Sequence, residues 1–326
     1  MSAGLEGRVL VTGGAGFLAR GIYGRARREG WSAQFTAFSR DDAKHAALQA
    51  RYPEVQCVLG DVAQTSLDDL TLLMRGFDLV IHAAASKYVD RAEAAAFDTT
   101  RTNVIGSMNV ADAAIFARVP QVIAISTDKA CAPVNVYGMT KAVMERLMQE
   151  ADRRSAATRF NVVRYGNVIG STGSVIPMFM RWAAAGEPIR VTDPLMTRFW
   201  MGIDEAVEVI VRARAATPGT VLIPPMRAME MKNLVRMALG LHEYGALPTE
   251  GVEVIGVRAG EKRHETIVQS NESVRTLHRA DGWYEIGPPT SRGAERTAFE
   301  LTSKAPPGGW LGIDEMRDYV AAAALV

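Results

Sequence analysis

The chain has 326 residues, enough for one large α/β domain with a smaller appendage. Lys and Arg number 37 against 36 for Asp and Glu, so the net charge of +1 gives no field that would attract a nucleic acid or an anionic membrane surface. No stretch approaches the roughly 18 apolar residues of a spanning helix, and the start has no basic segment followed by a long apolar run. We therefore expect a soluble cytoplasmic protein.

Cys57 and Cys131 are too few for a disulfide framework, and no Cys/His spacing resembles a metal site, so we expect both thiols to be reduced and no metal.

The first half of the chain alternates short β-branched runs with stretches of helical length. Such alternation, with near-continuous apolar strands, predicts a parallel sheet covered by helices on both faces, a doubly wound Rossmann-type α/β fold. The predicted strands are 8–13, 34–39, 55–61, 78–85, 121–126 and 160–168, and segments such as 41–50 and 66–74 are predicted helices.

After about Asn167 the alternation weakens, because Gly and Pro are scattered through the sequence, although 204–215 still has the pattern of one helix. We therefore predict a nucleotide-binding domain at 1–166, to which 200–224 returns. A smaller, interleaved α/β substrate-binding lobe is expected at 167–199 and 225–326, the latter including the C-terminal tail.

The first predicted strand is followed directly by TGGAGFLA, which contains Gly13, Gly16 and Ala19. Small residues at this spacing allow a tight turn, let the backbone approach a pyrophosphate, and place a helix N-terminus beside it. An ordinary tight turn is the alternative. Its place between the first strand and the first helix favours a dinucleotide site.

The end of the second predicted strand bears on which dinucleotide binds. An acid there would accept hydrogen bonds from the ribose of NAD, whereas this chain has Ser39 and Arg40 before Asp41, with Lys44 following. These residues favour NADP over NAD. The alternative is a solvated loop in which Asp41 or Asp42 caps the next helix.

Two further strand ends are expected to line the same site. Asp61 and Val62 would lie near the adenine, while Ala83, Ala84 and Ala85 would leave room for the nicotinamide half, unless these small residues only pack. His82 is interpreted as a core histidine.

The stretch STDKACAPVNVYGMTK, from Ser126 to Lys141, lies at the carboxyl edge of the predicted sheet, where ligands of such folds bind. Tyr137 and Lys141 would share a face of one helix, and a neighbouring ammonium favours the phenolate, so Tyr137 could take a proton from an alcohol. The alternative is a Tyr and a Lys on a helix surface. Asp128 and Lys129 add a second acid and a second base.

Several motifs together carry a family resemblance. TGGAGFLA, HAAA, Asn103 and the Tyr137/Lys141 pair resemble an extended short-chain dehydrogenase/reductase. More narrowly, STDKACAPVNVYGMTK, VRYGNVIGSTGSVIP, TDPLMTRFW and VRAGEKRHE resemble the NADP-dependent, C5-inverting UDP-N-acetylglucosamine 4,6-dehydratases of the soluble, pseudaminic-acid-type branch of polysaccharide biosynthesis. The similarity runs from about residue 8 to about residue 268, and WLGIDEMRDYV in the tail matches only loosely.

This resemblance implies a division of catalytic labour. Tyr137, Lys141 and NADP would oxidise C4 of a UDP-sugar, Lys129 would remove the C5 proton, Asp128 would protonate the C6 oxygen, and Thr127 would polarise the C4 oxygen. Hydride would return to C6, giving a UDP-4-keto-6-deoxy-N-acetylhexosamine with C5 inverted. Lys129 must be partly neutral, which a buried place near the nicotinamide would favour.

The resemblance also implies the binding residues. The cofactor contacts would be Gly13, Gly16, Phe17, Leu18, Ser39, Arg40, Lys44, Asp61, Val62, Ala83, Ala84, Ala85, Asn103, Tyr137, Lys141 and Val168. The substrate contacts would be Lys87, Asn167, Ser174, Val175, Arg198, Arg258 and Glu261, each Arg having a surface ion pair as the alternative.

The chain departs from the family pattern at a few places. Cys131 and Ala132 replace a small residue and an Asn, Asp90 stands where Pro is usual, AEAAAFD replaces a stretch with Asn-Pro, and Thr172 replaces an Arg. These changes bear on acyl-group recognition and C5 stereochemistry, while every proton-transfer residue is in place. Cys131 is interpreted as a small filler.

The sequence is also compatible with two other functions. A sugar-nucleotide C4 epimerase would also oxidise C4 but lose no water, and a non-catalytic NADP-binding sensor would bind the cofactor without turnover. Relatives form homo-oligomers, so we expect one here, and the helix at 204–215 is a candidate for the interface.

Overall fold

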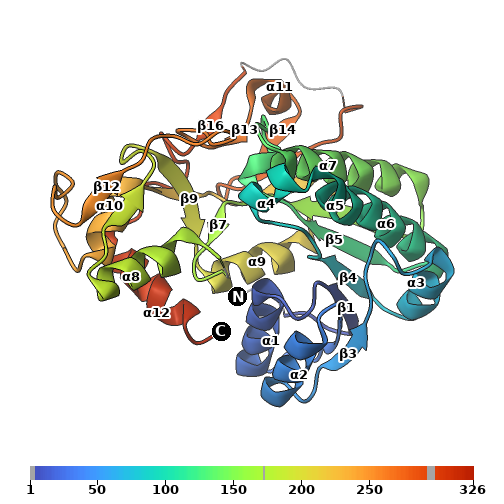
Figure 1. Ribbon diagram of the computed structural model, residues 1–326. Helices are drawn as coiled ribbons and strands as arrows, with labels where there is room; N and C mark the ends of the chain where they lie inside the picture. The colour runs from blue at the N-terminus through green and yellow to red at the C-terminus, as the bar shows by residue number, and fades with distance from the viewer. Residues whose placement is uncertain (1–3, 172, 292–297) are drawn as a thin grey trace.

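A nine-stranded sheet forms the centre of the molecule (Figure 1). The computed structural model describes residues 4–171, 173–291 and 298–326. The strand order is β14-β15-β10-β6-β5-β4-β1-β2-β3. All neighbours from β3 to β10 pair in parallel, whereas β15 pairs antiparallel with both β10 and β14. The strands are β1 (Arg8–Thr12), β2 (Gln34–Ser39), β3 (Gln56–Leu59), β4 (Leu79–His82), β5 (Gln121–Ile125), β6 (Arg159–Val163), β10 (Val221–Ile223), β14 (Thr276–His278) and β15 (Tyr284–Ile286).

Helices cover both faces of this sheet, because parallel crossovers carry them alternately to either side. On one face α1 packs on α9, and on the other α6 packs on both α3 and α7. The interior strands β1, β4 and β5 are almost wholly buried, which explains their continuous apolar sequence. The helices are α1 (Phe17–Glu29), α2 (Asp42–Arg51), α3 (Leu67–Met74), α6 (Gly106–Ala117), α7 (Val136–Arg154) and α9 (Ile203–Ala213). The predicted Rossmann-type fold is therefore confirmed.

A second, smaller lobe has its own hydrophobic core. It contains the sheet β11-β9-β7 and the pairs β12-β8 and β13-β16. Figure 1 shows α8, α10 and α12 gathered around β8 and β12 in this lobe. Its elements are β7 (Asn167–Val168), α8 (Val175–Ala185), β8 (Ile189–Val191), β9 (Thr197–Met201), β11 (Arg227–Glu230), α10 (Met231–Ala238), β12 (Val252–Val254), β13 (Thr266–Val268), β16 (Leu301–Thr302) and α12 (Ile313–Ala323).

Short helical segments complete the chain. They are α4 (Val89–Ala94), α5 (Ala96–Thr100), the π-helix η1 (Arg101–Ile105), the 3₁₀ turn η2 (Asp128–Ala130) and α11 (Ser270–Ser273). Within the described ranges, no helix has the length and apolar character needed to cross a membrane.

The structure corrects two details of the predicted organisation. Residues 276–286, assigned to the substrate lobe, supply β14 and β15 and so extend the large sheet, in addition to the return of 200–224 through α9 and β10. The helix proposed as an interface, α9, buries its apolar face within the chain, where it packs on α1. That face is therefore not available to another subunit.

Candidate active site

A cavity of about 1190 Å³ opens at the carboxyl ends of the parallel strands and extends toward the small lobe. Every predicted cofactor, substrate or catalytic residue lines it except Asn103, Asp128 and Val175. The motifs converge because each follows a strand, and parallel strands end at one edge of the sheet.

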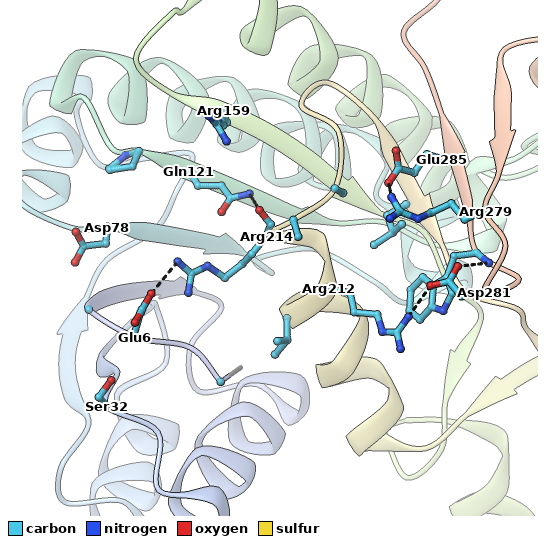
Figure 2. A pocket seen from close by; sticks show the side chains of 18 of the residues that line it. Glu6, Ser32, Asp78, Gln121, Arg159, Arg212, Arg214, Arg279, Asp281 and Glu285 are labelled. Atoms are coloured by element: carbon cyan, nitrogen blue, oxygen red, sulfur yellow. Dashed lines mark hydrogen bonds and ion pairs between the residues drawn. The ribbon is translucent and has the colours of Figure 1, made fainter. Parts of the chain in front are cut away.

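A second groove, of about 1310 Å³, lies at the opposite, amino-terminal edge of the strands. Figure 2 shows its charged side chains turned toward one another. Arg212 pairs with Asp281 at 3.0 Å and Arg279 with Glu285 at 2.6 Å. No predicted site residue lines this groove. We therefore place the site in the carboxyl-edge cavity.

The glycine turn has the geometry that a pyrophosphate site requires. Gly13 has φ of +69°, and a Cβ on it would lie 2.9 Å from the backbone nitrogen of Ala84, so only glycine fits. Gly16 precedes α1 as its N-cap, and the first turn of α1 contains neither an acid nor a side-chain cap. The amides at this helix end are therefore free to bind an anion.

The loop after β2 presents two cations to the cavity. Arg40 lies 3.2 Å from the Asp61 carboxylate, and the Lys44 ammonium lies 2.7 Å from Asp41. Asp41 also caps α2 by accepting a hydrogen bond from the Lys44 backbone. Ser39 hydrogen-bonds His45 at 2.7 Å. Asp41 is therefore a cap, as the alternative interpretation expected, and Arg40 and Lys44 line the cavity, while the preference for NADP over NAD stays a prediction.

Asn103 lies behind the cavity wall, in the π-helix η1, and is 1% exposed. Its Oδ1 accepts from the Ser86 backbone at 2.7 Å, and its Nδ2 donates to the Ser86 carbonyl and to Thr140. It therefore ties the loop after β4 to α7, which carries Tyr137. His82 is fully buried between Thr12 and Ser107, as expected of a core histidine.

Tyr137 and Lys141 lie in the first two turns of α7, and Lys141 is 3% exposed. Burial lowers the pKa of Lys141 to about 8, against the opposing effect of Glu145. Burial raises the pKa of Tyr137, as does Asp128, while Lys129 and a hydrogen bond with Thr127 lower it, and the net direction is upward. The expectation that Lys141 depresses this pKa is therefore wrong. The nearby cation that favours the phenolate is Lys129.

The second acid and base form a close pair. Lys129 Nζ donates to Asp128 Oδ1 at 3.0 Å, and Thr127 Oγ1 donates to the same oxygen at 2.9 Å. Asp128 is fully buried, its Oδ2 has no hydrogen-bond partner, and it reaches the cavity only through Thr127 and Lys129.

The charge state expected of Lys129 needs correction. Burial lowers its pKa, but the Asp128 and Glu265 carboxylates outweigh this effect, so the pKa is raised. We expected a partly neutral Lys129 from its burial near the nicotinamide, without the effect of these carboxylates. These carboxylates favour the ammonium form of Lys129.

The substrate side of the cavity contains the predicted loop residues. Asn167 Oδ1 accepts from Lys129 Nζ at 3.4 Å. Ser174 is the N-cap residue of α8, and its buried hydroxyl has no hydrogen-bond partner. Val175 begins α8 behind the wall. Lys87, after β4, lines the cavity opposite these residues. Thr172 lies outside the described residues.

The two predicted arginines differ in how firmly they are held. Arg198 Nη1 donates to the backbone carbonyls of Thr197 and Arg263. The half-exposed Arg258 lies 3.5 Å from Asp90, the residue that replaces a family proline. Glu261 accepts from the Arg258 backbone at 3.4 Å, so it shapes this turn.

Glu265 is the principal site residue that the sequence interpretation missed. It lines the cavity, is 4% exposed, and lies 3.9 Å from Lys129 Nζ. The sequence feature that could have identified Glu265 is its position at the end of VRAGEKRHE, four residues after Glu261. His264, beside it, hydrogen-bonds Thr197, in agreement with a packing role.

Comparisons with known proteins agree with this geometry. Residues 9–284 match the family described as polysaccharide biosynthesis protein. The chain is 34% identical over 307 residues to a Campylobacter jejuni protein named UDP-N-acetylglucosamine 4,6-dehydratase (inverting), covering 92% of this chain and 88% of that relative. It is also 34% identical over 287 residues to a Rickettsia massiliae protein named UDP-glucose 4-epimerase, covering 85% and 82%. The X-ray structure of Pen from Bacillus thuringiensis superposes over the full length of both chains, with a TM-score of 0.85 and 28% identity.

Proposed function

The chain belongs to the polysaccharide biosynthesis protein family, and from this premise we propose that it is an NADP-dependent UDP-N-acetylglucosamine 4,6-dehydratase that inverts C5. A close UDP-N-acetylhexosamine is an equivalent substrate. The observation that carries the proposal is the Asp128–Lys129 contact of 3.0 Å on the wall of a dinucleotide cavity that also holds Tyr137 and Lys141. Simple oxidation needs only the latter pair.

The residues around the glycine turn fit the cofactor. Gly13 allows the chain to turn tightly against the Ala84 backbone, where a Cβ would not fit, and the uncapped start of α1 offers amides to the pyrophosphate. Ser39, Arg40 and Lys44 would hold the 2′-phosphate of NADP, with Asp61 and Val62 beside the adenine and Ala83–Ala85 beside the nicotinamide. When bound, the nicotinamide accepts the hydride from C4 and returns it to C6.

The chain's own residues would move the protons. Tyr137, as the phenolate that Lys129 and the hydrogen bond with Thr127 favour, takes the proton of the C4 hydroxyl. A proton then passes from Lys129 Nζ to Asp128 Oδ1, so that an N–H bond breaks, an O–H bond forms, and the pair becomes an amine and a carboxylic acid. Lys129 removes the C5 proton, the C5–H electrons form the C5–C6 double bond, and the C6 oxygen leaves as water with the proton of Asp128.

The remaining polar residues would bind the substrate. Ser174 and the start of α8 would face the diphosphate, as would Arg198 and Arg258, since helix N-termini and guanidinium groups suit phosphate oxygens. Lys87, Asn167, Val175 and Glu261 would surround the sugar and the ribose.

The test is incubation with UDP-N-acetylglucosamine in deuterated water, followed by mass spectrometry and proton NMR. We expect a product lighter by one water, with the C5 and C6 signals reporting inversion and deuterium uptake. Mass spectrometry of the copurified nucleotide identifies NADP or NAD.

A variant sharpens this test. Lys129→Met should lower product formation at least 100-fold, because loss of a proton-transfer group typically costs about 10² to 10⁴. Loss of its charge should also slow C4 oxidation, since Lys129 lowers the pKa of Tyr137, but reduced cofactor should still accumulate because elimination is blocked more strongly. Lys232→Met, which removes an ammonium paired with Glu230 on the small lobe, should keep wild-type rates.

The second candidate is a C4 epimerase, favoured by the similarity to the Rickettsia protein. It predicts a product of unchanged mass, so the same experiment separates the two. Tight NADP binding with no turnover of any UDP-hexosamine would instead support a non-catalytic sensor and contradict both enzymes.

A further inference from the structure

Glu265 is a buried carboxylate in the active-site wall that has no part in the steps described above. It is 4% exposed, and its backbone is fixed to Ser303 by two hydrogen bonds of 2.8 Å. Oε2 is buried without a hydrogen-bond partner. The backbone of Glu265 is therefore fixed in the wall, and its Oε2 is not engaged by a hydrogen bond.

Three cations from separate segments surround this carboxylate. Oε1 lies 3.9 Å from Lys129 Nζ, on η2, and 3.8 Å from Arg198 Nε, on β9. Oε2 lies 3.9 Å from Lys262 Nζ, in the turn before β13. These distances exceed hydrogen-bond lengths, so Glu265 acts on its neighbours mainly through its charge.

Lys129 consequently lies between two carboxylates. Asp128 contacts it at 3.0 Å and Glu265 at 3.9 Å. A carboxylate near an ammonium favours the protonated form of the amine. Glu265 thus opposes loss of the proton that the Lys129–Asp128 pair holds.

We propose that Glu265 is a positioning residue that retains, between Lys129 and Asp128, the single proton that this pair must deliver to the C6 oxygen. The inference rests on the proposed function. The pair must hold one proton in total, as ammonium and carboxylate before the transfer and as amine and acid when elimination occurs. Once that proton is lost, Lys129 is a free base but Asp128 has nothing to donate, and elimination stops.

The titration behaviour of the cluster agrees with this role. Burial lowers the pKa of Lys129, but Asp128 and then Glu265 raise it, Arg198 lowers it, and the net direction is upward. Burial raises the pKa of Glu265 itself, as does Asp128, while Lys129, Arg198 and Lys262 lower it, and the net direction is upward. The three surrounding cations are therefore what favours its carboxylate form. Tyr137, on α7, is the remaining titratable group beside the pair.

The test is a single-turnover experiment on the holoenzyme with UDP-N-acetylglucosamine across pH. Absorbance of the reduced nicotinamide rises with C4 oxidation and falls only after elimination has produced the acceptor for the hydride. In Glu265→Gln, we expect the alkaline limb of the falling phase to move to lower pH by about one unit, because a lost neighbouring charge lowers the pKa of the pair. The rising phase and KM should keep their wild-type pH dependence.

Matched variants separate this role from a structural one. Glu265→Met also removes the charge and should shift the alkaline limb by the same amount, so the test can use whichever of the Gln and Met variants folds. Glu265→Asp keeps the charge and should leave the alkaline limb at its wild-type pH. Glu261→Gln, four residues away on the same wall, should raise KM without moving the limb. A wild-type limb in Glu265→Gln, or an equal shift in Glu261→Gln, would overturn the proposal. If the wild-type chain forms no dehydrated product, the proposed function fails instead.

Discussion

Ala132 adopts a left-handed backbone conformation, with φ of +44°, in the exposed loop between the two proton-transfer pairs. A Cβ in this region costs about 1 kcal/mol, and Asn tolerates it better than other non-glycine residues. By resemblance, the family has Asn here. Ala132→Asn should therefore raise the free energy of unfolding by about 0.5 kcal/mol. Denaturant titration measures this change.

The control for this prediction is Ala157→Asn, in the exposed turn after α7, where φ is not positive. That substitution should leave stability within about 0.5 kcal/mol or lower it slightly. An equal gain at both positions would mean that backbone strain at Ala132 is not the cause.

Cys131, the other departure in this loop, is a packing residue. It is fully buried, burial raises the pKa of its thiol, and its Sγ lies 3.5 Å from Glu272. Lys262 donates to its carbonyl at 2.7 Å, which fixes the loop. A protonated, enclosed thiol is not a nucleophile, in agreement with the interpretation of Cys131 as a filler.

At the residue scale, the sequence indicated which residues line the cavity but not the direction in which their pKa values shift. The glycine turn, Tyr137 and Lys129 line one cavity because their motifs follow parallel strands. The pKa directions of Tyr137 and Lys129 were not predictable, because both depend on burial and that of Lys129 also on Glu265, which is far from it along the chain.

At the scale of elements, a buried ion cluster joins α7, β6 and α11. Arg164, directly after β6, is 1% exposed and contacts Glu145 on α7 at 2.6 Å and Glu272 on α11 at 2.8 Å. Burial raises the pKa of Glu272, but the hydrogen bond and charge of Arg164 outweigh it and lower the pKa to about 2. The cluster therefore fastens the C-terminal segment to the large sheet.

This cluster gives a second prediction on stability. The folded-state pKa of Glu272 lies below its unfolded value of about 4.3, so its contribution is present above that value and is lost as pH falls toward 2. Glu272→Gln should lower the free energy of unfolding by about 3 kcal/mol at pH 7, because it leaves Arg164 partly unpaired. The difference from wild type should shrink in acid.

The matched control is Glu54→Gln, which removes a carboxylate paired with Arg27 where both side chains are about half exposed. It should cost at most about 1 kcal/mol, with little pH dependence. A Glu272→Gln penalty equal to that of Glu54→Gln, or one independent of pH, would contradict the assigned role.

Whether a helix or strand could be predicted depends on whether its own sequence or distant parts of the chain determine it. The strands β1 to β5 and the helix α9 were predicted, because each has its own apolar run and period. The predicted strand 160–168 instead divides into β6 of the large sheet and β7 of the small lobe. The strands β14 and β15 have three residues each and join the large sheet only after the chain has passed through the lobe. No local pattern encodes that return.

At the scale of the whole molecule, the outer faces of α6 and α7 expose large apolar side chains. Met108 and Phe116 on α6 are 41% and 61% exposed, and Met139 and Val143 on α7 are 49% and 45% exposed. The two helices are in contact, and Figure 1 shows them side by side on one flank of the sheet. Large apolar side chains left exposed on two neighbouring helices of a folded protein indicate a protein interface.

We predict that a second copy of the chain covers this face, giving the homo-oligomer expected from the family resemblance. Light scattering after gel filtration should give at least twice the chain mass for the wild type. Phe116→Glu and Met139→Glu should each shift it toward a monomer, because an interface centre does not tolerate a buried unpaired charge. Leu195→Glu, at a 48% exposed position in the small lobe, should leave the mass unchanged. A monomeric wild type at micromolar concentration, or dissociation by Leu195→Glu alone, would show that this flank is not the interface.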